Sequence, residues 1–408
     1  YDAIIVGSGA GGGMAGYVLA NAGLKVLMLE AGPYYDPAKH SQQLFWPWQS
    51  LRRGAGTTRP FGDFDAAFGG WEIDGEPYTR AEGTQFDWFR SHMLGGRTNH
   101  WGRISLRFGP KDFKGKSHDG VGEDWPISYE DVKPFYDRID RMLGIYGTKE
   151  GLENDPDGIF MKPPKPRLHE IMIKKAAAKV GVPVIPGRGS VLTEDLPDNP
   201  DRKKCFYCGQ CARACRIYGD FSSSSCLVIP AQKYTENLEL ICNAMVREVL
   251  TNDEGLATGV AFINKEDGLE YQVKGKVVVL AASACSTARI MLNSRNSRHP
   301  NGIGNSSGLV GKYLSRKNRP VYEALWEIMP GPDFPTLVDS LLLPELEADQ
   351  CYARFPDAGG RAMVSDQPTP GDGNVAPSFE VLQTGYAPDE VSLDAVGATP
   401  MAPVAYVY

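Results

Sequence analysis

Residues 2–32 read DAIIVGSGAGGGMAGYVLANAGLKVLMLEAG. The apolar run at residues 3–6 has the length of a buried strand, and a glycine-rich turn follows it directly. Apolar residues then recur at helical spacing, and residues 25–30 form a second apolar run that ends in an acid. A strand, a glycine-rich turn, a helix and a second strand, in this order, predict the first unit of an α/β dinucleotide-binding domain.

Three glycines of the turn, Gly7, Gly9 and Gly12, have G-x-G-x-x-G spacing. In this interpretation Gly7 makes the tight turn, Gly9 lets the backbone approach a pyrophosphate, and Gly12 lets the helix pack on the strand. The first turn of the helix would offer unpaired N–H groups to the phosphates. A chain with 46 glycines can also produce this spacing by chance, so a purely structural turn is the alternative.

The acid that ends the second run, Glu30, is placed to accept hydrogen bonds from a ribose. A carboxylate at this position disfavours a 2′-phosphate and therefore NADP, which leaves NAD or FAD. The Ala31–Gly32 pair that follows Glu30 favours FAD.

Length and composition limit the possible classes of protein. A chain of 408 residues predicts two domains. The net charge of −7 and the sequence pI of about 5.5 argue against nucleic acid or an anionic membrane as the main partner. No apolar run approaches the roughly 20 residues needed to span a bilayer. The sequence opens inside an apolar run, so we expect further residues before Tyr1.

Regular and irregular stretches alternate beyond the opening unit. Residues 33–90 are rich in Gly, Pro, Trp and Phe and predict an irregular insertion. Amphipathic helices are predicted over 126–143, with Ser128 as the N-cap, and over 167–181. A strand, a turn and a second strand are expected within 238–264.

The stretch KKCFYCGQCARACRIYG holds half of the eight cysteines. These are Cys205, Cys208, Cys211 and Cys215. Their C-x2-C-x2-C-x3-C spacing matches bacterial ferredoxin ligands, although Arg216 stands where proline is usual. An iron–sulfur cluster is the favoured interpretation, and zinc or disulfides remain alternatives. A cluster has either three or four irons, depending on whether Cys215 is a ligand.

Three stretches together resemble the glucose–methanol–choline (GMC) oxidoreductases: residues 2–32, LGGRTNHWG at 94–102, and KVVVLAASACSTARIMLNS at 276–294. This resemblance implies an α/β fold with a discontinuous, Rossmann-like FAD-binding domain and a sheet-based substrate domain. The first part of the FAD-binding domain, with an irregular insertion, is expected at residues 1–125, and the first part of the substrate or cap domain at 126–202. The cysteine loop is expected at 203–235, the second part of the FAD-binding domain at 236–316, and an incomplete second part of the substrate domain at 317–408.

The resemblance also implies cofactor contacts, by position, for Gly95, Gly96, Asn99, Val246, Ala281 and Ala282. His100 falls where the related pyranose oxidases bond a histidine covalently to the flavin, so FAD is expected either linked to His100 or unlinked beside it. The implied chemistry is oxidation of a sugar or alcohol hydroxyl by hydride transfer to the flavin. The base of such enzymes lies in a C-terminal segment, and none of the six histidines follows residue 299, so we expect the catalytic base beyond Tyr408 and name no catalytic residue.

Some bacterial sugar dehydrogenases of this type relay electrons from flavin through a trinuclear iron–sulfur cluster to a cytochrome subunit. The cysteines of residues 203–219 fall in the corresponding region, which implies a dehydrogenase with a cytochrome or other protein acceptor. A non-catalytic electron-transfer or assembly subunit that retains FAD and cluster is the alternative. The same likeness implies a periplasmic location with membrane association through a partner, and the cytoplasm is the alternative.

Overall fold

The computed structural model describes almost all of the first 312 residues and a short segment near the end of the chain. The described residues are 1–49, 69–70, 76–79, 88, 90–120, 122–312 and 405–407. The chain divides into two compact units, Tyr1–Arg103 with Ser190–Leu314, and Ile104–Gly189 with Ser315–Tyr408. The sections expected from the sequence have boundaries at residues 125, 202, 235 and 316, which differ from the boundaries of these two units. The assignment of each section to FAD binding, substrate binding or the cysteine loop stays a prediction.

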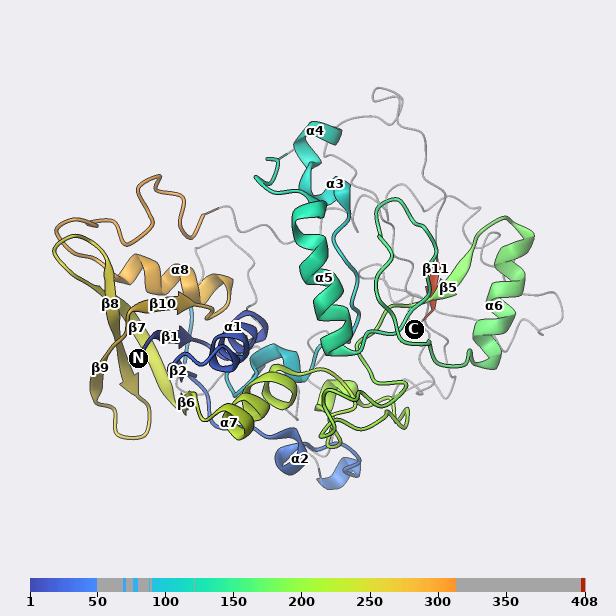
Figure 1. Ribbon diagram of the computed structural model, residues 1–408, viewed down its shortest axis with the longest axis horizontal. Helices are drawn as coiled ribbons and strands as arrows, with labels where there is room; N and C mark the ends of the chain where they lie inside the picture. The colour runs from blue at the N-terminus through green and yellow to red at the C-terminus, as the bar shows by residue number, and fades with distance from the viewer. Residues whose placement is uncertain are drawn as a thin grey trace. The chain divides into compact units, whose positions relative to one another are not determined.

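A parallel four-stranded sheet with the order β10-β1-β2-β6 forms the centre of the first unit (Figure 1). Its strands are β1 (Ala3–Val6), β2 (Val26–Leu29), β6 (Leu238–Ile241) and β10 (Val277–Leu280). Ala3 pairs with Val277, and Val26 pairs with Leu238. Because these segments are more than 200 residues apart in the chain, the predicted discontinuous Rossmann-like unit and the α/β class are confirmed.

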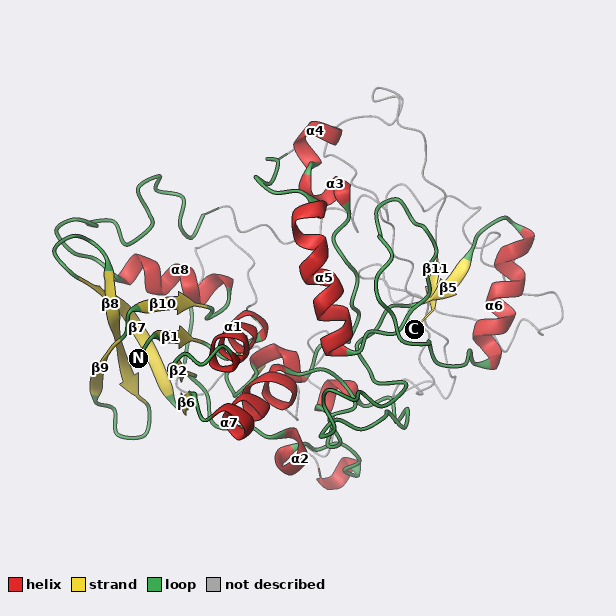
Figure 2. Ribbon diagram, in the orientation of Figure 1, coloured by secondary structure: helices red, strands yellow, loops and turns green. Residues whose placement is uncertain are grey.

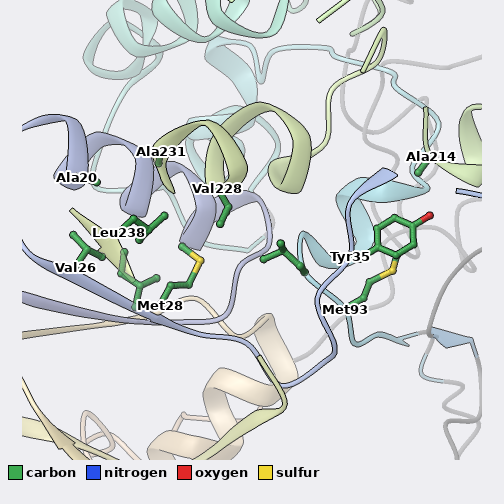
Figure 3. Close-up of a cluster of buried hydrophobic side chains, with 11 residues drawn as sticks. Ala20, Val26, Met28, Tyr35, Met93, Ala214, Val228, Ala231 and Leu238 are labelled. Carbon is green, nitrogen blue, oxygen red and sulfur yellow. The ribbon is translucent and has the colours of Figure 1, made fainter. Parts of the chain in front are cut away.

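One face of this sheet packs against helices. Helix α1 (Ala10–Asn21) and helix α7 (Ile229–Thr235) cover the side of Ile5 and Met28. Figure 3 shows Met28 and Leu238 facing Val228 and Ala231 of the helical layer. These side chains are almost fully removed from water, and each buried aliphatic group contributes roughly 1.5–3 kcal/mol.

The opposite face packs against a second sheet and one helix. This antiparallel sheet consists of β7 (Ala244–Thr251), β8 (Ala257–Asn264) and β9 (Glu270–Lys274). Together with helix α8 (Ala284–Asn293) it buries Ile4 and Leu27. Successive residues of β1, Ile4 and Ile5, therefore serve different cores, as the period-two geometry of a strand requires.

The first unit also contains short elements (Figure 2). They are α2 (Pro37–His40), η1 (Pro47–Gln49), β3 (Gly69–Gly70), β4 (Arg90–Ser91), η3 (Gly96–Asn99), η4 (Cys211–Arg213) and the π-helix η5 (Ser224–Val228).

The second unit contains the two predicted helices. They are α5 (Tyr129–Leu143) and α6 (Leu168–Lys179), and Ser128 caps α5 by accepting a hydrogen bond from the N–H of Asp131. The unit also holds α3 (Pro110–Phe113), α4 (Gly115–Asp119), and the paired strands β5 (Val184–Pro186) and β11 (Ala405–Val407). Within the described part of the chain, no helix is both long and apolar enough to cross a membrane.

The expectation of one strand, a turn and a second strand over 238–264 is wrong in its count. The structure forms three strands there, because the chain turns at Asn243, whose φ of +56° ends β6 and starts β7. Most of the irregular insertion predicted over 33–90 lies outside the described residues.

Candidate cofactor site

The glycine turn has the geometry that its spacing predicts. Gly7 has a φ of +93°, and a Cβ added there would lie 2.6 Å from the carbonyl oxygen of Ala281. A Cβ on Gly12 would lie 1.9 Å from the carbonyl oxygen of Gly7. Both positions therefore exclude side chains for reasons of packing.

Gly9 differs from its two partners because a Cβ there would meet no atom within 4 Å. Gly9 is the N-cap of α1, and no side chain caps the first turn of that helix. The turn therefore presents backbone N–H groups and open space together, which are the two features that a phosphate group needs at a helix N-terminus.

Glu30 lies behind this turn and is buried. Its carboxylate accepts hydrogen bonds from the backbone N–H of Ser8 at 3.0 Å and of Gly32 at 2.9 Å, and from the Ser8 hydroxyl. Burial raises the pKa of Glu30, and the donors from Ser8 and Gly32 oppose that shift. The predicted ribose contact stays a prediction, and in this structure Glu30 fixes the shape of the glycine turn.

Ser8 joins the turn to the segment at 94–102. Its hydroxyl oxygen accepts a hydrogen bond from the N–H of Gly95 at 2.9 Å. Gly95 has a φ of +87°, and the Cβ position of Gly96 lies 3.8 Å from the Cα of Gly9. The structure therefore brings Gly9 close to Gly95 and Gly96, which follow it by more than 80 residues in the chain.

Asn99 is fully buried and uses its side chain within the protein. Its amide nitrogen donates to the carbonyl oxygens of Leu94 at 2.8 Å and Gly96 at 3.1 Å, while its amide oxygen accepts from Ser224 at 2.8 Å. This amide shapes the Gly95–Gly96 turn, and a direct cofactor contact by Asn99 stays a prediction.

The end of β10 forms the other wall of the glycine turn. Ala281 donates its N–H to the carbonyl oxygen of Val6, and Ala282 lies against Gly7. An open apolar hollow of about 470 Å³ adjoins this wall. Its lining includes Gly11, Leu280, Ala281, Thr287, Met291 and Val310. The small side chains predicted here thus leave space beside the first turn of α1.

Two further residues that are predicted to contact the cofactor, Val246 and Ala31, differ in how deeply they are buried. Val246 is buried in the core on the β7 side of the sheet, with Leu27 and Phe262, whereas Ala31 is half-buried next to Glu30. Both roles stay predictions.

His100 follows η3 and is buried. Burial lowers the pKa of His100 to about 4, and the positive charges of Arg103 and Arg97 lower it further. The imidazole is therefore neutral near pH 7 and has a lone pair, which a nucleophilic ring nitrogen requires. A covalent bond from His100 to flavin stays a prediction.

Sequence reasoning missed four consecutive serines, Ser222 to Ser225, which are fully buried. The Ser223 hydroxyl donates to the carbonyl oxygen of Ser8 at 2.7 Å, and the Ser223 N–H donates to the Thr98 hydroxyl at 2.9 Å. Ser223 and the adjoining π-helix thus connect the glycine turn to the 94–102 segment. An uninterrupted polar run between Phe221 and Cys226 was the signal that could have revealed it.

The four clustered cysteines lie in one loop, where burial raises the pKa of the Cys205 and Cys215 thiols. The Gln43 amide nitrogen lies 3.0 Å from the sulfur of Cys208 and 3.8 Å from that of Cys215. Burial raises the pKa of Cys211 to about 12, and nearby Arg103 partly opposes this. In the part of the chain that the structure describes, no group of three or more His, Cys, Asp or Glu side chains is arranged to hold a metal ion.

Arg103 connects the cysteine loop to the 94–102 segment. Its guanidinium lies 2.5 Å from the Asp220 carboxylate, and both side chains are 3% exposed. It also donates to the carbonyl oxygens of Asn99 at 2.9 Å and Cys211 at 2.8 Å. Trp101 adds a hydrogen bond to the carbonyl oxygen of Phe221 at 3.0 Å. Residues 98–103 and 220–224 are thus joined by a buried ion pair and several hydrogen bonds.

Comparison with known proteins agrees with this geometry. The family model described as GMC oxidoreductase matches residues 1–317. The chain belongs to the GMC oxidoreductase family. Membership supports FAD as the cofactor, and the open space at Gly9, the uncapped start of α1 and the nearby Gly96 fit its pyrophosphate.

Relatives of this GMC oxidoreductase include a 2-methyl-1,2-propanediol dehydrogenase of Mycolicibacterium austroafricanum, 29% identical over 77% of this chain and 54% of that protein. The fructose dehydrogenase large subunit of Gluconobacter japonicus is 27% identical over 77% of this chain and 58% of its own length. A solved structure of pyridoxine 4-oxidase is 16% identical, with a TM-score of 0.46, and the match covers 72% of this chain and 51% of that one. The chain spans about half the length of the curated relatives it matches.

Proposed function

We propose that this GMC oxidoreductase is an FAD-dependent dehydrogenase that oxidises a hydroxyl group of a sugar or a related alcohol. The observation that carries the proposal is the meeting of Gly9, Gly96 and Ala281 around one open turn, since these come from the three stretches of the family resemblance. Bound FAD supplies the hydride acceptor. The uncapped N–H groups of α1 bind its pyrophosphate, and Glu30 and Ser8 hold the turn in the required shape.

The substrate class rests on the relatives. One is named for a diol and another for fructose, and both names describe dehydrogenases. Polyols and sugars therefore come first among the substrates to test.

We further propose that electrons leave through an iron–sulfur cluster held by the cysteine loop. Thiolates are soft ligands that suit such a cluster, and the Gln43 amide and Arg103 lie where they can offset thiolate charge. A bound cluster supplies a one-electron acceptor. The alternative ligand, zinc, supplies no redox chemistry and would leave the loop a purely structural element.

The acceptor is proposed to be a separate protein, either a cytochrome or another redox subunit. The name of the Gluconobacter relative, a large subunit, supports an assembly of this kind. Periplasmic placement, with membrane association through that partner, stays part of the proposal, and separating periplasmic from cytoplasmic protein in the source cells tests it.

An anaerobic absorption titration tests this function. The complete protein is mixed with fructose, with 2-methyl-1,2-propanediol and with a non-hydroxylic control of similar size. We expect flavin bands that a hydroxylic substrate bleaches, and iron and sulfide in the same sample. Flavin that no polyol or sugar bleaches would support the alternative of a non-catalytic electron-transfer subunit. A colourless protein that binds no added FAD would overturn both.

A further inference from the structure

Six large apolar side chains are exposed in and beside the cysteine loop. They are Leu44, Phe45, Trp46, Trp48, Phe206 and Tyr207, and we call them the aromatic patch. Trp46 is 61% and Trp48 66% exposed, and their rings stack with centroids 5.1 Å apart. Single exposed apolar residues are ordinary on a protein surface, but a concentration of large ones marks an interaction site.

Hydrogen bonds hold the two parts of the aromatic patch together. The N–H of Leu44 donates to the Gln210 side chain at 2.7 Å, and the Gln43 amide contacts the Cys208 sulfur. The Ser41 hydroxyl donates to the carbonyl oxygens of Arg213 and Ala214. Residues 41–45 therefore lie along residues 208–214, and the patch surrounds thiols that are themselves half-exposed.

The backbone of the patch is strained where its side chains are exposed. Leu44 has a φ of +67° and Tyr207 a φ of +59°, values that bulky residues rarely adopt. Neither side chain contributes to the hydrophobic core, since Leu44 is 58% and Tyr207 52% exposed. Strain of this kind concentrates at ligand clamps and functional sites rather than in loops without a role.

The charges within the two segments that carry the patch have one sign. Residues 203–219 contain four Lys or Arg and no Asp or Glu, and residues 41–49 carry no charged side chain, in a chain of net charge −7. Lys203, Lys204 and Arg216 are exposed, and Arg213 is half-buried. Cations thus border an aromatic centre, which is the composition of a protein-binding surface with a polar rim.

We propose that the aromatic patch and the cations Lys203, Lys204, Arg213 and Arg216 form the docking surface for a redox protein whose own contact face is acidic. The proposal rests on the function proposed above, because it places the electron acceptor directly over the cysteine loop. Carboxylates of the partner pair with Lys203 and Lys204 at the rim, and Trp46 and Trp48 provide the desolvated centre.

Anionic lipid is the competing occupant, because tryptophan and lysine also suit a membrane surface. The position of the thiols favours a protein partner over lipid, since Cys205, Cys208 and Cys211 lie within the same surface and are half-exposed. A lipid headgroup would cover the thiols but would not accept electrons from a cluster that they hold.

Binding measured without substrate tests the proposal. The complete protein is immobilised, and the probes are the soluble haem domain of cytochrome b5, which is acidic, mitochondrial cytochrome c, which is basic, and vesicles of phosphatidylglycerol and phosphatidylcholine. We expect the acidic probe alone to bind, and added salt to weaken its binding. Trp46→Ser with Trp48→Ser, and separately Lys203→Glu with Lys204→Glu, should each weaken it about tenfold or more.

Matched controls lie in the second unit. Trp125→Ser removes a 59% exposed tryptophan, and Lys174→Glu with Lys175→Glu reverses two adjacent exposed lysines. Both controls should bind the acidic probe as the unaltered protein does. Equal losses of binding in the control and patch variants would overturn the proposal. It would also be overturned if the acidic probe does not bind, while the patch variants abolish binding of vesicles or self-association of the protein.

The outcome is separable from that of the proposed function. If substrate bleaches the flavin and a small dye accepts the electrons while no acidic protein binds, the docking proposal fails and the dehydrogenase stands. If the acidic probe binds through the patch while no substrate bleaches the flavin, the docking surface stands and the dehydrogenase fails.

Discussion

The glycine turn and the cysteine loop are fixed by different means. Close backbone packing and two buried side chains fix the turn: β1 and β10 pair on one side, Gly7 and Gly12 allow contacts that any side chain would block, and the side chains of Glu30 and Ser8 add hydrogen bonds. Side chains fix the loop, through Gln43, Ser41 and Arg103. Three of the eight described non-glycine residues with positive φ, Tyr207, Ala214 and Tyr218, lie in the loop. The turn is therefore held by close backbone packing as well as by buried hydrogen bonds, whereas the loop depends on a few long-range contacts.

The largest effect is expected from removing the ion pair of Arg103 and Asp220, which joins the cysteine loop to the 94–102 segment. Arg103→Met takes away the cation that pairs with the buried Asp220 carboxylate and leaves only the weaker influence of Arg202, which should cost about 3 kcal/mol of unfolding free energy. Urea denaturation measures this change.

The control for this prediction is Arg103→Met combined with Asp220→Leu, which removes both charges. Because the double variant also removes the carboxylate that Arg103→Met leaves without its paired cation, it should be clearly more stable than Arg103→Met alone. Equal stability of the single and double variants would show that the pair contributes nothing beyond packing.

A smaller effect is expected within the glycine turn. Gly12→Ala places a Cβ 1.9 Å from the carbonyl oxygen of Gly7, so the turn must shift, at a cost of about 1–3 kcal/mol. Gly11→Ala is the matched control, since its Cβ would meet the nearest atom at 4.0 Å. Thermal unfolding that is the same for both variants would contradict the packing explanation.

Acid should destabilise the protein through His100. Its pKa is about 4 when folded and 6.5 ordinarily, so in that window the unfolded chain binds the proton more readily and stability falls as pH decreases. Between about pH 7.5 and 5.5 the loss should be about 1.4 kcal/mol. Urea unfolding of His100→Gln should lack this component, and an unchanged pH dependence would refute the assignment.

The smallest effect is expected at the junction of the cysteine loop with residue 43. Gln43→Ala removes the contacts to Cys208 and Cys215, for roughly 0.5–1 kcal/mol. Labelling of thiols in the metal-free protein should become faster, because the loop loses an anchor. Gln272→Ala on the exposed face of β9 provides the control, and equal labelling rates in both variants would count against the anchor.

The sequence predicted those parts of the site whose causes are local. An apolar run, glycine spacing and a following acid are enough to place β1, the turn, α1 and β2, and Ser128 identified the start of α5. These features depend on backbone conformation and periodicity, which short stretches determine.

The remaining parts depend on contacts between distant segments. Nothing in the sequence around Arg103 or Asp220 indicates that the two pair across 117 positions. Likewise, nothing in the glycine motif indicates that Ser8, between Gly7 and Gly9, accepts a hydrogen bond from Gly95. The pairing of β6 with β2 was also missed, because periodicity identifies a strand but not its neighbour. Most of the insertion at 33–90 and almost all of the section expected at 317–408 lie outside the described residues.

Flavin retention in Gly9→Val tests the central claim most directly. A Cβ at Gly9 meets no protein atom within 4 Å, so the variant should fold as the unaltered protein does, yet its side chain would occupy the space assigned to the pyrophosphate. The account predicts that purified Gly9→Val has unchanged thermal unfolding in the absence of flavin and has lost most bound FAD. A folded Gly9→Val protein with its full complement of FAD would contradict the assignment of this turn as the cofactor site.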